Sequence, residues 1–233
     1  MGDRVRIAIV GSGPAGLSAA AHAARLGLSH VLLEKTDHLS DTIFKYQKGK
    51  HVMATPSQLV LRSDCDFEAG KREAILDVWN RQAAEQGITV AYDAEVEAIS
   101  GEAGAFLLRT KKGDLHRAEA VILAIGTQGN PNMLRCPGGE GGLSRPLIQY
   151  QLDDPGEYVD EHITVIGSGD AGIENALGLA ADAAQGNVVT ILNRSADFAR
   201  AKGANVKLLA EARDAGRIRV MTETTPAELR EDE

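Results

Sequence analysis

The sequence predicts an α/β protein, and two segments of the same pattern are the main reason. "IAIVGSGPAGLSAA" (7–20) and "ITVIGSGDAGIENA" (163–176) each join an apolar strand to a helix through a G-x-G-x-x-G turn. The strands are continuously apolar, which is typical of parallel sheets that are covered on both faces. We therefore expect two Rossmann-like, three-layer domains with parallel sheets, at 1–128 and 129–233. The glycine- and proline-rich stretch 126–146 is the expected crossing between them.

The rest of the chain continues this alternation of strands and helices. The elements expected in the first domain are a strand at 4–10, a helix ending at Gly27, a strand at 30–35, an amphipathic helix at 68–87 and strands at 88–92, 95–100, 105–110 and 118–126. Residues 36–68 have no clean period, and long irregular segments inside compact domains are usually functional. Those expected in the second domain are a strand–helix–strand unit at 162–194, a helix at 203–216 and a strand at 217–222.

The composition argues against several classes of function. The net charge of −8 disfavours nucleic acid or an anionic membrane as the main partner. No apolar run is long enough to span a bilayer and no signal peptide precedes the first strand, so we expect a cytoplasmic protein. Cys65 and Cys136 fit neither a disulfide framework nor the spacing of a metal site, so we read them as ordinary reduced thiols.

The glycines of the two turns have distinct roles. The first glycine permits the tight turn, the second lets the backbone approach a pyrophosphate, and the third lets the helix pack closely on the strand. In this order, the glycines of the two copies are Gly11 and Gly167, Gly13 and Gly169, and Gly16 and Gly172. The free amides and partial positive charge of the following helix favour the phosphates. The alternative is that both are merely glycine-rich strand–helix turns.

The two copies differ at the end of the following strand, where the ribose is recognised. The first strand ends in Glu34, whose carboxylate can accept hydrogen bonds from a ribose 2′-hydroxyl and would repel a 2′-phosphate. The second ends in Asn193, followed by Arg194 and then Arg200, so cations replace the acid. We expect an unphosphorylated ribose at the first site and NADPH at the second. The arginines could instead be a solvated helix entry.

With these motifs in place, the chain resembles the two-dinucleotide-fold flavoprotein reductases of the thioredoxin reductase-like branch, over nearly its whole length. "IVGSGPAGLSAA" resembles the FAD turn of that family, and "AEAVILAIGTQGNPN" resembles the segment that closes its first FAD section. "LRCPGGE" is similar to the opening of the NADPH domain, "VIGSGDAGIENALGLA" to its cofactor turn, and "NRSADFARA" to the motif that holds the NADPH phosphate.

The resemblance implies a role for each matching residue. The residues it places on FAD are Gly11, Ser12, Gly13, Pro14, Ala15 and Gly16 at the pyrophosphate, Glu34 and Lys35 at the ribose end, Val96 at the adenine, and Ala124, Gly126 and Thr127 beside the flavin or its phosphates. Those it places on NADPH are Gly167, Ser168, Gly169, Asp170, Ala171 and Gly172 in the turn, with Asn193, Arg194 and Arg200 at the phosphate. It also places Glu174 near the nicotinamide, although an acid in a first helical turn also suits the helix dipole.

Two departures from the family pattern qualify the resemblance. Thioredoxin reductases proper carry C-x-x-C before the second turn, whereas this chain has only Cys136 there, so these residues provide no dithiol relay. The closer resemblance is to ferredoxin–NADP reductases of this fold and bacillithiol-disulfide reductase-like proteins. The family also returns to finish its FAD fold after the NADPH domain, and no such return follows 217–233. We expect a fragment or half of a longer reductase, with further domains C-terminal to it.

These features predict a flavoprotein oxidoreductase that passes a hydride from NADPH to FAD and then to an acceptor, which could be ferredoxin, a disulfide or a small molecule. The sequence names no catalytic residue. Lys48 and His51 fall in the irregular segment expected to border the flavin, or else form an exposed basic loop. Two alternatives remain: a nucleotide-binding sensor without turnover, and a flavin monooxygenase, although F-x-G-x-x-x-H is absent before the second turn. The family suggests a homodimer.

Overall fold

A computed structural model describes residues 4–52, 63–127, 133–139 and 147–230. The chain divides into two compact units, Met1–Pro131 and Asn132–Glu233. The predicted boundary after residue 128 lies outside the described residues, as does much of the expected crossing at 126–146.

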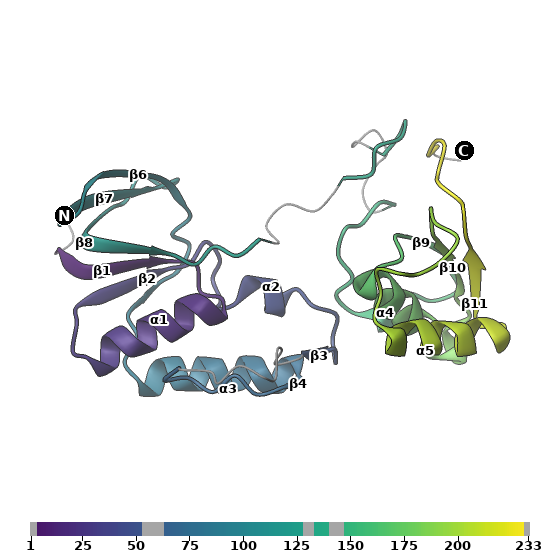
Figure 1. The fold of residues 1–233 in the computed structure, drawn as a ribbon, viewed down its shortest axis with the longest axis horizontal. Coiled ribbons are helices and arrows are strands. Elements are labelled where there is room, and N and C mark those ends of the chain that lie inside the picture. Colours follow the sequence, from purple (N-terminus) through teal and green to yellow (C-terminus); the bar gives the residue numbers. More distant parts are fainter. Residues whose placement is uncertain (1–3, 53–62, 128–132, 140–146, 231–233) are drawn as a thin grey trace. The chain divides into compact units, whose positions relative to one another are not determined.

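Unit 1 is built on a six-stranded sheet in the order β5-β2-β1-β8-β7-β6 (Figure 1). Its strands are β1 (Val5–Val10), β2 (His30–Leu33), β5 (Val90–Ala91), β6 (Val96–Glu102), β7 (Ala105–Thr110) and β8 (Leu115–Leu123). The strands β5, β2, β1 and β8 run parallel, while β7 pairs antiparallel with both β8 and β6. The glycine turn follows β1, so it lies at the carboxyl edge of the parallel strands, where ligands bind in open α/β sheets.

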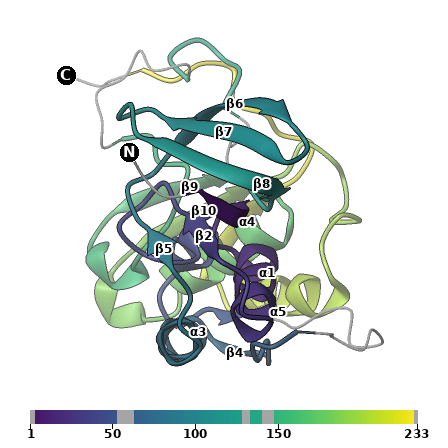
Figure 2. The same cartoon turned by 90° about the vertical axis from the view of Figure 1, so that its left-hand side faces the viewer.

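Two helices cover one face of the parallel strands, and the antiparallel strands of the same sheet cover the other face (Figure 2). Helices α1 (Pro14–Arg25) and α3 (Arg72–Glu85) pack on Ile9 and Leu32 through an apolar cluster that includes Leu17 and Trp79. The alternate positions of β1 and β2 point to the opposite face, where they meet Leu108 of β7. The expected layers are therefore present, with the second face of the parallel strands covered by a β-meander rather than a helix.

The segment expected to be irregular contains short elements of its own. Helix α2 (Asp41–Phe44) follows β2, and β3 (His51–Val52) pairs antiparallel with β4 (Gly70–Lys71). Helix α3 accordingly begins at Arg72, four residues later than the periodicity predicted, because Gly70 and Lys71 are extended and bonded to β3. Residues 53–62 of this segment lie outside the described part of the chain.

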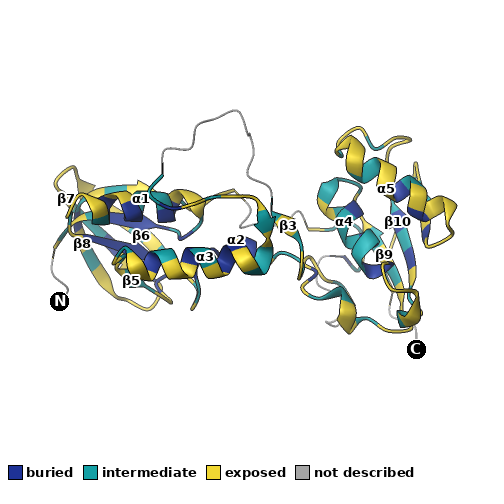
Figure 3. Ribbon diagram, turned by 90° about the horizontal axis from the view of Figure 1, so that it is seen from below, coloured by how far each residue is buried: buried dark blue, intermediate teal, exposed yellow. Residues whose placement is uncertain are grey.

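Unit 2 repeats the strand–helix–strand pattern on a smaller scale. Its parallel sheet has the order β11-β10-β9. Its elements are β9 (His162–Ile166), α4 (Asp170–Leu179), β10 (Val188–Leu192), α5 (Gly203–Asp214) and β11 (Ile218–Met221), with 3-10 turns at Pro155–Glu157 and Ala183–Gln185. Helices α4 and α5 bury Ile173 and Leu209 against Val189 and Ile191 of β10. In both units the buried residues follow the strands and the sheet-facing sides of the helices (Figure 3).

The end of β8 leaves apolar side chains uncovered. Within the described residues, β8 pairs with β7 only as far as Ala118, and beyond that point it pairs with β1 alone. Leu123 and Ile125 are 63% and 69% exposed. Among the described helices, none is both long and apolar enough to cross a bilayer.

Candidate functional site

The first glycine turn has the geometry that the sequence predicted for it. Gly11 has φ +97°, and a Cβ there would lie 2.6 Å from the carbonyl oxygen of Ala124. A Cβ on Gly16 would lie 1.8 Å from the carbonyl oxygen of Gly11. Gly13, in contrast, has open space within 4 Å of the position its Cβ would take. Gly11 and Gly16 are therefore required by the fold itself, whereas the bare backbone at Gly13 is left open to a ligand.

The start of α1 can accept an anion. Gly13 is its N-cap residue, Pro14 occupies the first helical position, and no side chain caps this end. The amide of Leu17 already donates to the carbonyl oxygen of Gly13 at 2.9 Å, so the amides that precede it are the ones at the positive end of the helix. Pro14 and Ala15 are exposed. This arrangement fits a pyrophosphate.

Glu34, which follows β2, is buried and held by four donors. One carboxylate oxygen accepts the amide of Ser12 at 3.0 Å and the hydroxyl of the same residue. The other accepts the amide and the hydroxyl of Thr36, both at 3.1 Å. The Thr36 hydroxyl has a single proton and also lies 2.9 Å from the carbonyl oxygen of His38, so it is shared between this carbonyl and Glu34. Since two of the donors are hydroxyl groups that can rotate, ribose hydroxyls could replace them without any movement of the backbone.

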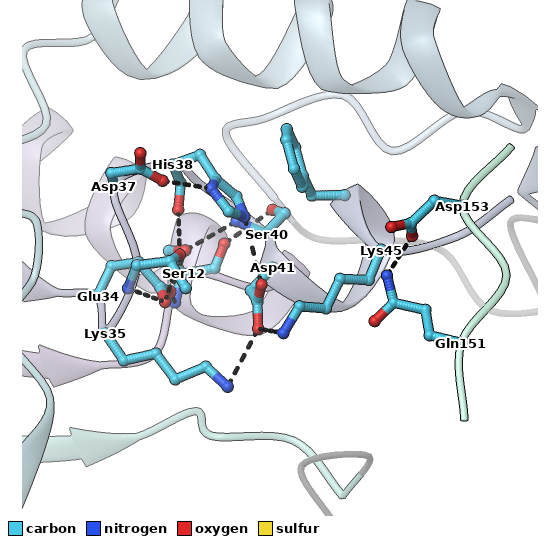
Figure 4. Close-up of polar contacts among 12 residues, drawn as sticks. Ser12, Glu34, Lys35, Asp37, His38, Ser40, Asp41, Lys45, Gln151 and Asp153 are labelled. Carbon is cyan, nitrogen blue, oxygen red and sulfur yellow. Dashed lines mark hydrogen bonds and ion pairs between the residues drawn. The ribbon is translucent and has the colours of Figure 1, made fainter. Parts of the chain in front are cut away.

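The segment after Glu34 closes against the glycine turn through contacts that sequence reasoning missed (Figure 4). The amide of Ser40 donates to the Ser12 hydroxyl at 2.8 Å, and the Ser40 hydroxyl donates to the Ser12 carbonyl at 2.9 Å. Ser40 has φ +58°, an uncommon conformation for a residue with a side chain. Nothing in the local sequence indicates this partner, because Ser12 and Ser40 meet only when β1 and β2 pair.

Beside this network, Asp41 lies between two lysines. Its carboxylate is 3.0 Å from the ammonium group of Lys35 and 3.2 Å from that of Lys45. Burial by itself would raise the pKa of Asp41, but the two hydrogen-bonded lysines outweigh it and hold the pKa below its ordinary value. Lys35, a predicted cofactor residue, is thus engaged with Asp41 in this structure.

The remaining predicted residues of unit 1 lie at three places. Val96 begins β6 and packs against the cluster on the meander side of the sheet. Ala124 follows β8, and its amide donates to the carbonyl of Val10 at 2.8 Å, beside the glycine turn. Gly126, with φ +67°, and Thr127 are exposed at the end of the described stretch. The structure therefore brings Ala124, but not Val96, into contact with the turn.

The second glycine turn repeats the first. Gly167 has φ +118°, and a Cβ on Gly172 would lie 1.9 Å from the carbonyl oxygen of Gly167. At Gly169 the Cβ position is again open, and no side chain caps the start of α4. Ala171, in the first turn of this helix, is exposed. This turn fits a second pyrophosphate for the same physical reasons.

Asn193 takes the place in unit 2 that Glu34 takes in unit 1. Its side-chain oxygen accepts the hydroxyl of Ser168 at 2.7 Å, as Glu34 accepts that of Ser12, and also the amide of Ser195 at 3.1 Å. Its side-chain nitrogen donates to the carbonyl of Asp197 at 2.5 Å. The amide is therefore bonded through both of its ends while 2% exposed, and it places no negative charge at this strand end.

The other charged residues predicted in unit 2 fall into two groups. Arg194 and Arg200 are exposed, and neither forms an ion pair within the described part of the chain. Asp170 and Glu174, both half-buried in α4, accept hydrogen bonds from the side-chain nitrogen of Asn205 in α5, at 2.8 and 3.0 Å. This link between the two helices was not predicted from the sequence.

Neither cysteine is in a disulfide in this structure. Cys65 lies in unit 1 and Cys136 in unit 2, and both are free. Burial raises the pKa of the Cys65 thiol, and the nearby carboxylates of Asp64 and Asp66 raise it further. A thiol is a nucleophile only as its thiolate, so Cys65 is poorly suited to exchange chemistry.

The comparison with known proteins identifies the fold family. Residues 8–232 match the model of the pyridine nucleotide-disulphide oxidoreductases. The chain belongs to this family. Its α/β fold, with parallel strands in the sheets of both units, and its thioredoxin reductase-like class are those predicted from the sequence.

The relatives of this chain include the two kinds of reductase that the sequence resembled. The ferredoxin–NADP reductase of Gluconobacter oxydans is 30% identical over 193 residues, which are 82% of this chain and 53% of the relative. The thioredoxin reductase of Peptoclostridium litorale is 28% identical over 205 residues, which are 86% of this chain and 58% of that relative. The bacillithiol disulfide reductase of Staphylococcus aureus shares the fold, with a TM-score of 0.84 at 22% identity, covering 99% of this chain and 70% of that structure. The chain thus spans little more than half the length of these curated relatives.

Proposed function

We propose that this chain carries the FAD-binding and NADPH-binding units of a flavoprotein oxidoreductase, with FAD at the first glycine turn and NADPH at the second. The observation that carries the proposal is the contrast between two turns whose second and third glycines have the same surroundings. Gly13 and Gly169 both leave open backbone at a helix start, but Glu34 follows one turn and Asn193 the other. When bound, the two cofactors supply hydride transfer, and the protein supplies binding and electrostatics.

In unit 1, the chain's own residues hold and orient the dinucleotide. The amides at the start of α1 bind the pyrophosphate, and the buried carboxylate of Glu34 accepts the ribose hydroxyls in place of the Ser12 and Thr36 hydroxyls. Because this carboxylate would repel a 2′-phosphate, unit 1 takes FAD and not NADPH.

In unit 2, the neutral amide of Asn193 removes that repulsion. The exposed guanidinium groups of Arg194 and Arg200 are available to a 2′-phosphate, and an arginine–phosphate contact is among the stronger hydrogen bonds of proteins. We infer a preference for NADPH over NADH from this arrangement.

The electron acceptor that best fits is a protein or small molecule that takes electrons directly from the flavin. The chain has no C-x-x-C pair, and Cys65 is buried with a raised pKa, so a dithiol relay within these residues is disfavoured. A ferredoxin is the leading candidate, since several relatives are ferredoxin–NADP reductases.

The proposal is tested by adding NADPH or NADH to the purified, FAD-loaded protein without oxygen. We expect NADPH to remove the yellow flavin absorbance, and NADH to do so more slowly. If both nucleotides bind and neither changes the flavin, the protein is a nucleotide-binding sensor rather than a reductase.

A further inference from the structure

We propose that Asp170 and Asn205 are positioning residues that fix the arginine-bearing loop of unit 2, residues 194–202, relative to the second glycine turn. The inference rests on the proposed function, because it concerns how the phosphorylated ribose of NADPH is told apart from an ordinary ribose. It extends that function to two residues whose side chains act through the loop and not on the nucleotide itself.

The loop is held at its start and its middle by contacts within unit 2. Asn193 accepts the amide of Ser195 and donates to the carbonyl of Asp197. Phe198 packs against the apolar core of the unit, and the amide of Ala201 donates to the carbonyl of Phe198 at 2.9 Å. These contacts, with the packing of Ala201 against the same core, set the path of the chain after Arg194, and the next residue, Lys202, is held in addition by a side chain of α4.

Asp170 supplies this further anchor. Its carboxylate oxygen accepts the backbone amide of Lys202 at 2.8 Å and, through the same atom, the side-chain nitrogen of Asn205 at 2.8 Å. Lys202 is the N-cap residue of α5, and its side chain does not cap the helix. Asn205 also donates to Glu174, one turn further along α4. The start of α5 is thereby fixed to the start of α4.

The position of Asp170 in the sequence makes this anchor important for the nucleotide. It directly follows Gly169, where a pyrophosphate would lie, and the amide it holds is two residues beyond Arg200. The link therefore sets the spacing between the turn that takes the pyrophosphate and the loop that takes the 2′-phosphate. A charge-assisted hydrogen bond to a carboxylate is suited to holding such a spacing.

Loss of the link should weaken the affinity for ligands that carry a 2′-phosphate and leave the affinity for other nucleotides nearly unchanged. The matched ligands are 2′,5′-ADP and 5′-AMP, which differ by that phosphate, and their affinities for the 233-residue chain are measured by calorimetry. We expect D170A and N205A each to weaken 2′,5′-ADP by about tenfold, a usual size for coupling between two sites, and 5′-AMP by less than about twofold. D170N should retain most of the affinity, since its amide oxygen can accept both hydrogen bonds.

Asp182 offers a matched control, because it also accepts a backbone amide at a helical N-cap in unit 2, that of Ala184 at 2.9 Å. D182A should leave the ratio of the two affinities unchanged. If D170A fails to fold, N205A still removes the Asn205 part of the link from the α5 side, while the backbone amide of Lys202 keeps its bond to Asp170.

Three results would overturn the inference. If D170A and N205A weaken both ligands equally, their role is general stability. If wild type prefers 2′,5′-ADP and both variants keep the preference, the inference fails while the proposed function stands. If the wild-type protein binds the two ligands with equal affinity, or binds neither of them, the NADPH assignment fails and the inference fails with it.

Discussion

The substitution Glu34→Gln tests the central feature of the first site. The carboxylate of Glu34 accepts two backbone amides, and they lie on different oxygens: Ser12 on one and Thr36 on the other. Glutamine has only one side-chain oxygen, so in either orientation its NH₂ group faces a backbone N–H. One donor, either the buried amide of Ser12 or the part-buried amide of Thr36, is then left without an acceptor.

The cost of this mismatch can be worked out from the burial of the site. Glu34 is 4% exposed and Ser12 is 0% exposed, so water cannot replace the lost acceptor. A buried donor left unsatisfied costs about 1–3 kcal/mol in free energy of unfolding. For a unit of this size that lowers the melting temperature by roughly 4–12 °C. The affinity for FAD should fall as well, because the charged acceptor for the ribose is lost.

Calorimetry and urea unfolding of the purified chain would measure the effect, with Glu119→Gln as the control. Glu119 also lies on the unit 1 sheet, but its ion pairs with Arg4 and Arg6 involve side chains 37–60% exposed, so its loss should cost less than about 1 kcal/mol. The reasoning would be refuted if Glu34→Gln were as stable as wild type. The reverse change, Asn193→Asp, should also destabilise, because a carboxylate oxygen would then face the carbonyl of Asp197.

Further substitutions test the glycine turns, the arginines and one ion-pair cluster. Gly16→Ala should destabilise unit 1 by several kcal/mol in thermal unfolding, because its Cβ would lie 1.8 Å from a carbonyl oxygen. Gly13→Ala should fold normally but retain less FAD on gel filtration, because its Cβ position is open. Equal stability of the two variants would contradict the geometry. Replacing both Arg194 and Arg200 by alanine should lower NADPH affinity by about tenfold or more and leave NADH affinity unchanged in fluorescence titrations; a parallel loss of both would argue against a phosphate contact. Asp41 has a folded-state pKa below its ordinary value of 3.8, so the stability it contributes is full above that value and lost as the pH falls through the lower folded pKa. Asp41→Asn should therefore flatten the acid limb of a stability-versus-pH curve, and an unchanged limb would count against the cluster.

Most of the fold was predictable because its signals are local. The apolar strands, the glycine turns and the helix that ends at Gly27, with φ +66°, were each read from a few consecutive residues. The start of α3 was predicted four residues early, because the pairing of Gly70 and Lys71 with β3 is a contact between distant segments and leaves no periodic trace. The short helix α2 was missed for a similar reason, since its N-cap residue Ser40 is held by Ser12 from another strand end.

The sequence by itself determined which residues form the two turns and that they differ in charge at the strand ends. Those features depend on the residue type and backbone conformation of single positions. A glycine is needed, for example, where φ is positive or where a Cβ would meet a carbonyl oxygen. Only the tertiary structure decided what the polar side chains hold. Glu34 meets Ser12, and Asp170 meets Lys202 and Asn205, because parallel strands bring the residues at their carboxyl ends to one edge, across more than 20 positions of sequence.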